Sequence, residues 1–295
     1  MRSLIRLVIG ITALVITAIV LAAPLANAQW SLLAPGTREG SPGNNRYYYL
    51  VWASPIPGME TQFNDWYQNN HMGDLVQLPG WVGAQRFRIV ADVGTRPTKL
   101  GYDAGYLIVW DVDEKDFATA NKFVTDALRG GKSRRGAGFN YGGDNGGSGT
   151  YRVVSPRVAR PDGKSWTKLD ANDPKQTRPG RFMLMEFTNA APGKEAEFDQ
   201  GNQEHIQQML QLPGFLATQR LVNDAAPTAR GTPYKPRYLT IYELEGKNAA
   251  ELNKVLGEAT KAGTVKPNPA ASTDDAQIVF WEPISPYITR EDFER

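Results

Sequence analysis

Short runs of apolar and aromatic residues alternate along this chain with longer stretches of helical spacing. The run 47–52 is rich in aromatic and β-branched residues, which is typical of a strand. Residues 60–77 have the spacing of a helix, which ends at Leu78-Pro79-Gly80 because proline disfavours helix at the residue before it. The same criteria predict further strands over 82–90, 106–112, 151–155 and 277–282.

Two more helices are predicted from capping residues. Asp113 is interpreted as an N-cap, since the residues that follow it have helical apolar spacing, namely Phe117, Ala120, Val124 and Leu128. Asn248 and Glu251 have the spacing of a capping box before another such helix, with apolar residues Leu252, Val255, Leu256 and Ala259.

The second half of the chain repeats the order of the first. Gln77-Leu-Pro-Gly80 recurs as Gln211-Leu-Pro-Gly214, and Gln85-Arg86 recurs as Gln219-Arg220. The strand 106–112 matches 238–244, 46–52 matches 181–187, and Pro57-Gly58-x-Glu60-x-x-Phe63 matches Pro192-Gly193-x-Glu195-x-x-Phe198. Collinear matches over this span indicate an internal repeat.

Each half therefore predicts an α+β unit of the ferredoxin-like βαββαβ type. Such a unit has helices on one face of an antiparallel sheet, so its other face needs a cover. We expect the two sheets to cover each other and form an intramolecular, pseudo-dimeric α+β barrel. The expected division is a signal peptide at 1–28, repeat 1 at 44–158, a linker at 159–180, repeat 2 at 181–288 and a C-terminal tail at 289–295.

The N-terminal segment predicts export. Arg2 and Arg6 precede the apolar run 7–25, and Ala26-Asn27-Ala28 has the small-x-small pattern of a cleavage site after Ala28. An uncleaved membrane anchor is the competing interpretation. Cleavage leaves a periplasmic or secreted protein that does not stay in the membrane.

Composition excludes several kinds of site. Loss of Arg2 and Arg6 leaves 31 of the 33 basic residues against 31 acidic ones, and no basic tract for nucleic acid remains. The chain has no Cys, and its two His offer little to a metal centre. We expect no metal and no cofactor.

The two His residues, His71 and His205, occupy the same position of the repeat, late in the first helix of each half. A His here can act as a general acid or base because its ordinary pKa lies near neutrality. A structural role, in which each His bonds a loop, is the alternative. We expect the two not to share a metal.

The halves differ by one residue in this helix. Phe63 and His71 are eight residues apart, whereas Phe198 and His205 are seven apart. The extra residue predicts either a π-bulge in the helix, a feature common at functional sites, or a longer loop before it. The inserted stretch brings Trp66 and Tyr67, and Tyr67 lies four residues before His71.

These observations place one competent site in the first half. His71 and Tyr67 are the expected catalytic residues, and His205 marks a secondary pseudo-site without a hydroxyl aromatic. The expected substrate-binding residues are Asn70, Trp66, Trp52, Trp81 and Trp110. Core filling remains the alternative for each Trp.

Three other features have open interpretations. Glu186 replaces Val51 in an otherwise apolar strand, and it is either a buried carboxylate with a raised pKa or an unremarkable edge residue. Arg86 and Arg220 recur in both halves, which favours a structural role. The stretch 130–149 contains nine Gly in twenty residues and is either a flexible excursion or a lid over the pocket.

The stretch Phe63-Asn-Asp-Trp66-Tyr67-x-x-x-His71, followed by Leu78-Pro79-Gly80 and Gln85-Arg86, resembles the EthD-like branch of the dimeric α+β barrel superfamily. The resemblance implies the barrel fold, a helix His as acid or base, and Tyr67 as a pocket residue. Its members include cofactor-free monooxygenases, polyketide cyclases, lactone isomerases, hydroxynitrile lyases and proteins without known catalysis. Members usually form the barrel by dimerising, and are usually cytoplasmic.

The sequence therefore predicts an exported, cofactor-independent enzyme that acts on a small hydrophobic, aromatic or phenolic compound. Lyase or isomerase chemistry is expected before oxygenase chemistry. The alternatives are a binding protein for a small apolar ligand and a structural or stress-related protein with a filled barrel. The expected state is a monomeric pseudo-dimer or a homodimer.

Overall fold

The computed structural model describes residues 41, 43–94, 104–132, 136, 146–160, 180–223 and 236–293. Eight long strands form a closed antiparallel barrel in the order β2-β3-β1-β4-β7-β8-β6-β9, because β9 also pairs with β2. Closure leaves no unpaired edge along these strands. Their bounds are β1 (Asn45–Ala53), β2 (Trp81–Gly94), β3 (Tyr106–Glu114), β4 (Gly146–Val153), β6 (Arg181–Ala190), β7 (Phe215–Val222), β8 (Tyr238–Glu245) and β9 (Ala271–Pro283). The closed antiparallel barrel agrees with the α+β barrel that the sequence predicts; the prediction that it is built from two repeats stays a prediction.

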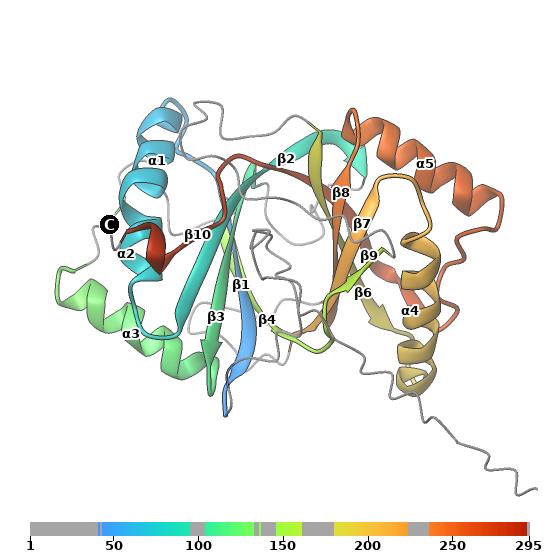
Figure 1. Cartoon of the computed structure of the whole chain (residues 1–295), viewed down its shortest axis with the longest axis horizontal. Helices are drawn as coiled ribbons and strands as arrows, with labels where there is room; N and C mark the ends of the chain where they lie inside the picture. The colour runs from blue at the N-terminus through green and yellow to red at the C-terminus, as the bar shows by residue number, and fades with distance from the viewer. Residues whose placement is uncertain are drawn as a thin grey trace, which may run out of the picture.

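The helices lie outside the barrel in two groups on opposite sides (Figure 1). One side carries α1 (Glu60–Trp66), the π-helix η1 (Tyr67–His71), α2 (Met72–Val76) and α3 (Phe117–Arg129). The other side carries α4 (Glu195–Met209) and α5 (Ala249–Lys261). A strand that lies beneath a helix, such as β1 or β6, therefore has two buried faces, one toward the barrel axis and one toward the helices.

Large side chains fill the barrel interior. Alternate residues of β1, Tyr48, Leu50 and Trp52, face this interior together with residues of every other long strand. The residues between them, such as Tyr47, belong to a separate cluster beneath α1, η1, α2 and α3. A third cluster lies beneath α4 and α5. Side chains that alternate in direction along each strand produce this layering.

Matching hydrogen bonds link the two halves of the chain. In each of these crossed contacts, the segment after the last long strand of one half bonds β2 or β7 of the other half. Ser285, after β9, accepts a 2.9 Å hydrogen bond at Oγ from the Arg86 amide, and its carbonyl accepts one of 3.1 Å from Gln85 Nε2. Ser155, after β4, makes the same two contacts to Arg220 and Gln219, at 2.9 and 3.2 Å.

Two short strands extend the crossed contacts. β5 (Val158–Ala159) pairs with β7, and β10 (Ile288–Thr289) pairs with β2. The 3₁₀-helix η3 (Arg290–Asp292) follows β10 and lies beside α2, where Arg290 Nη2 donates to the Leu78 carbonyl at 3.0 Å.

The predicted element boundaries need three corrections. Asp113 is not an N-cap, since β3 continues to Glu114, and Asp116 caps α3 by accepting a 2.7 Å hydrogen bond from the Thr119 amide. Leu128 is exposed at 37% rather than packed. Strands β2 and β9 are longer than predicted: β2 continues to Gly94, which pairs with Val279 of β9, and β9 begins at Ala271, which pairs with Ala190 of β6. The Asn248 cap is confirmed, as its Oδ1 accepts from the Glu251 amide at 2.8 Å.

The predicted signal peptide lies outside the described residues, as do residues 161–179 of the predicted linker. Within the part of the chain that the structure describes, no helix is both long and apolar enough to cross a membrane.

Candidate functional site

The first helix of the first half contains the predicted bulge. Residues Tyr67–His71 form a π-helix between two α-helical segments, whereas the matching helix α4 is α-helical throughout. An α-helix turns by about 100° per residue, so residues five apart lie on different faces. The wider π turn brings Trp66 and His71 onto the same side, where their rings stack. The one-residue insertion thus creates the contact.

Three aromatic rings surround the His71 imidazole. Trp66 stacks on it with ring centroids 4.3 Å apart and planes 16° apart. Tyr67 and Trp110 meet it at steep angles, with centroids at 5.5 and 5.6 Å. The Tyr67 and His71 side chains therefore adjoin, as predicted. Rings at these distances attract through their faces and edges and fix the imidazole in one orientation.

This apolar enclosure changes the acid–base properties of His71. Burial lowers the pKa of its imidazole from 6.5 to about 4, because the charged form loses its hydration. The Nδ1 atom is buried and has no hydrogen-bond partner among the described residues. At neutral pH His71 is therefore an uncharged imidazole with one nitrogen free to accept or donate a proton.

One residue of the Gly-rich stretch reaches this site. A Cβ added at Gly136 would lie 2.8 Å from three ring atoms of Trp66. Since His71 stacks on one face of Trp66, Gly136 is inferred to cover the other face. The stretch 130–149, for which a flexible excursion and a lid are both open, otherwise lies largely outside the described residues.

The other residues predicted to bind the substrate do not all lie near His71. Some belong to the cluster beneath the helices and one belongs to the barrel interior. Trp110 contacts His71 directly, and Trp81 packs behind Trp110 with centroids 5.5 Å apart and its indole N–H on the Ala120 carbonyl. The prediction for Trp52 is wrong. Trp52 faces the barrel interior, where it packs on Phe187, because neighbouring strand residues point to opposite faces. Asn70 lies in the π-helix and is half-buried, and its role stays a prediction.

His205 has a different environment from His71. Its Nδ1 contacts the Lys266 carbonyl at 2.9 Å, and its Nε2 faces Glu186 Oε1 at 3.3 Å. Burial opposes the charged form, but the hydrogen bond and charge of Glu186 and the Lys266 carbonyl outweigh it and raise the pKa of His205. Glu186 also accepts from the Tyr242 hydroxyl at 3.3 Å. It is therefore the carboxylate partner of His205, on the helix-facing side of the sheet.

The place of Tyr67 in the second half is filled by another segment. A Cβ at Gly201 would lie 2.3 Å from Asn268 Oδ1, and Asn268 Nδ2 donates to the Phe198 carbonyl at 2.9 Å. Residues 266–268 thus pack against α4, and the Lys266 carbonyl is the partner of His205 Nδ1. His71 belongs to η1 and His205 to α4, and these helices lie on opposite sides of the barrel (Figure 1), so the two His share no site.

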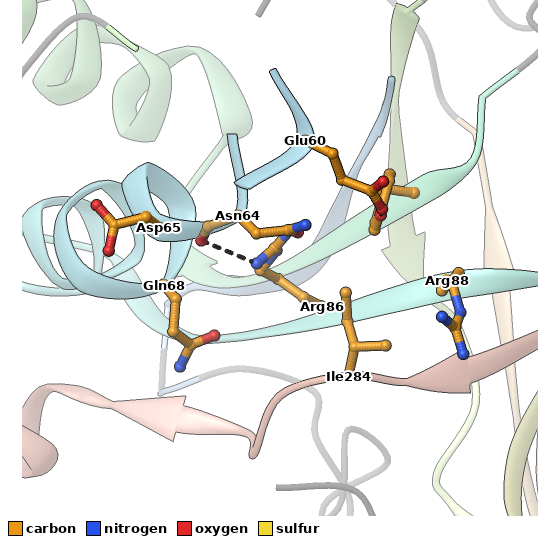
Figure 2. Close-up of a pocket in the computed structure, with 8 residues that line it drawn as sticks. Glu60, Asn64, Asp65, Gln68, Arg86, Arg88 and Ile284 are labelled. Atoms are coloured by element: carbon orange, nitrogen blue, oxygen red, sulfur yellow. Dashed lines mark hydrogen bonds between the residues drawn. The ribbon is translucent and has the colours of Figure 1, made fainter. Parts of the chain in front are cut away.

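A pocket of about 380 Å³ opens beside Tyr67, on the side where Arg86 lies (Figure 2). Its lining residues are Glu60, Asn64, Asp65, Gln68, Arg86, Arg88, Tyr106 and Ile284, from α1, η1, β2, β3 and the segment after β9. His71 is not among them. The Tyr67 ring contacts both the Arg86 guanidinium, at 5.0 Å from its centre, and the His71 imidazole, at a centroid distance of 5.5 Å.

The sequence pattern favours a structural role for Arg86 and does not predict this pocket. The backbone of Arg86 does serve the crossed contact to Ser285, but its side chain lines the pocket. The sequence does contain a difference that points to this pocket. The residue after Phe63 is the neutral Asn64, whereas the residue after the matching Phe198 is the acidic Asp199.

No protein-family model and no curated protein matches the chain. Among solved structures it is similar to a proposed monooxygenase from Fusobacterium nucleatum, at 10% identity and a TM-score of 0.47, over 83% of this chain and 95% of that one. An anthrone oxidase-like protein is similar at 10% identity and a TM-score of 0.46, over 83% and 93%. A chlorite dismutase variant from Candidatus Nitrospira defluvii is similar at 10% identity and a TM-score of 0.43, over 82% and 92%. The barrel assignment itself rests on the strand pairing of this chain.

Proposed function

We propose that this chain is a cofactor-independent enzyme that transfers a proton on a small aromatic or phenolic compound, with His71 as acid or base. The observation that carries the proposal is the buried, unpartnered Nδ1 of His71 within a wall of Trp66, Tyr67 and Trp110. A buried polar atom without a partner is costly, and such atoms in native proteins often have a catalytic role. Aromatic walls also suit an aromatic substrate.

The proposed chemistry is of the lyase or isomerase type. A neutral His71 takes a proton from the substrate, and the resulting imidazolium pairs with the new phenolate or enolate. The low pKa of the free enzyme rises in this complex, because an anion beside the imidazole favours its charged form. Tyr67 lies next to the imidazole, and we assign to it the role of orienting the substrate oxygen.

We also infer that the two halves are tandem copies and that the barrel is an intramolecular pseudo-dimer. The crossed contacts of Ser285 and Ser155 support this inference. In the second copy both ring nitrogens of His205 face protein oxygens, so this copy is assigned a structural role. The sequence pattern of the N-terminal segment supports the further proposal that the protein is exported and is periplasmic or secreted.

A binding protein for a small apolar molecule is the second candidate. The position of the pocket away from His71 favours it. The two candidates differ in one respect. Only an enzyme accelerates proton exchange in its ligand.

Hydrogen exchange tests the proposal without knowledge of the product. The protein is incubated in D₂O with a panel of small phenols and enolisable aromatic ketones, and loss of C–H signals is followed by NMR. We expect one class to exchange faster, and His71→Gln to slow it by about 10²-fold or more. The pH profile should fall with an apparent pKa near 4, well below that of an ordinary His.

The matched control is His205→Gln, which changes the same repeat position in the other half. It should keep the exchange rate of the wild-type protein. Wild-type exchange rates in His71→Gln for every accelerated compound would contradict catalysis by His71. Binding without accelerated exchange would favour the second candidate.

A further inference from the structure

Arg86 is an unusually placed cation. Only 2% of this residue is exposed to solvent. Its guanidinium carbon lies 5.0–5.8 Å from the ring centres of Phe63, Tyr67 and Tyr106. Nη2 donates to Asn64 Oδ1 at 2.5 Å and Nη1 donates to the Asn64 carbonyl at 3.3 Å. Nε is buried without a partner among the described residues.

No carboxylate of the described residues forms an ion pair with Arg86. Burial lowers the pKa of the guanidinium to about 10, which leaves it charged at neutral pH. Three aromatic faces and one neutral amide compensate this charge only in part, since cation–π contacts are weaker than an ion pair with a carboxylate. A buried charge without a counterion is costly. The site therefore favours an anion.

The second half shows the compensated form of the same arrangement. Arg220 matches Arg86 and forms an ion pair with Asp199 at 2.5 Å. Asp199 follows Phe198 as Asn64 follows Phe63. The first half has therefore exchanged a carboxylate for an amide at the one position that neutralises the Arg. It has done so on the side where the pocket lies.

The other charges of the pocket narrow the ligand class. Arg88 is already paired with Glu282 at 2.9 Å. The exposed Glu60 accepts a hydrogen bond from the Tyr106 hydroxyl, and the exposed Asp65 accepts one from Asn69 at 2.7 Å. These two acids at the rim disfavour a multiply charged anion such as phosphate. The Tyr106 ring and Ile284 offer apolar wall to the body of a ligand.

We propose that the pocket beside Tyr67 binds a small apolar monocarboxylate, whose carboxylate pairs with the Arg86 guanidinium in place of the missing Asp. Asn64 lies beside the guanidinium in Figure 2, and Gln68 also lines the pocket, so both supply neutral hydrogen-bonding groups. Guanidinium and carboxylate match in shape as well as charge. This site does not depend on the function proposed for His71.

Benzoate titration of the full chain, followed by calorimetry and by the NMR signals of the Arg side-chain N–H groups, tests the proposal. Saturable binding that shifts the Arg86 Nε–H signal is expected. Asn64→Asp recreates the Asp199–Arg220 pair within the first half, so it should weaken benzoate binding at least 10-fold while the protein melts at an equal or higher temperature. This variant restores an arrangement that the fold already contains, so misfolding does not explain a loss.

Three controls sharpen the result. Asp199→Asn makes the opposite change in the second half and should bind benzoate at Arg86 as the wild type does. Benzylamine and inorganic phosphate should bind more weakly than benzoate. His71→Gln should bind benzoate unchanged, which separates this site from the proposed catalysis. Absence of saturable benzoate binding, equal binding by Asn64→Asp, or equal binding of benzylamine or phosphate would each overturn the proposal.

Discussion

His71 and His205 show how one substitution sets the properties of an imidazole. Glu186 faces His205, and the residue that matches Glu186 in the first half is Val51, which has no carboxylate. Without a carboxylate, burial alone acts on His71 and its pKa falls to about 4. With one, the pKa of His205 rises. Two copies of one position thus have opposite charge preferences.

The lowered pKa of His71 predicts a pH-dependent stability. Between pH 6.5 and pH 4 the unfolded chain protonates this His while the folded chain does not, so the free energy of unfolding falls as the pH falls. The full effect of this one group is on the order of 3 kcal/mol. His71→Phe keeps a ring against Trp66 and removes the titration. Urea denaturation at pH 7 and pH 5 should show a smaller pH-dependent loss for the variant, and equal losses would contradict the assignment.

At the element scale, the π-helix is what separates the two copies of the first helix. Deletion of Asn69, which is exposed, shortens the Phe63–His71 spacing to the seven residues of the second half. Because the bulge absorbs the extra residue, the helix should continue as an α-helix with both flanks in register. We expect the Trp66–His71 stack to separate and proton exchange to fall to the level of His71→Gln. Circular dichroism should show an intact fold, and unchanged exchange would mean that the bulge has no role.

The elements also show what the sequence can and cannot reveal. The bulge is predictable because the second copy provides a seven-residue reference. The orientation of Trp52 is not, because β1 is buried on both faces and its apolar residues do not alternate with polar ones. The Asp113 error has a similar origin, since β3 extends beyond its apolar run and Asp113 contacts Ser41 and Arg46 there. The Arg86 pocket depends on the segment after β9, which lies about 200 residues away in sequence.

At the scale of the whole molecule, buried polar groups link the two halves. Asp111 on β3 is fully buried, and both its oxygens contact Arg46, with Nε–Oδ1 and Nη2–Oδ2 distances of 2.5 and 2.6 Å. The Tyr287 hydroxyl from the end of the second half donates to the same carboxylate at 2.6 Å. At the matching position of the second half, Glu243 accepts from Arg157 of the first half at 2.9 Å. Barrel closure therefore depends on carboxylates that receive a donor from the other half.

Asp111→Ala should destabilise the whole barrel rather than one half. The change leaves Arg46 buried without this counterion and the Tyr287 hydroxyl without its acceptor, so a loss of about 3–5 kcal/mol is expected. Lys122→Ala is the control, since the Lys122–Asp126 pair is exposed and its loss should cost about 0.5 kcal/mol or less. Urea unfolding followed at separate probes in the two halves should give one shared midpoint, lowered together in Asp111→Ala. Separate midpoints, or a loss no larger than that of Lys122→Ala, would show that the halves fold independently of this link.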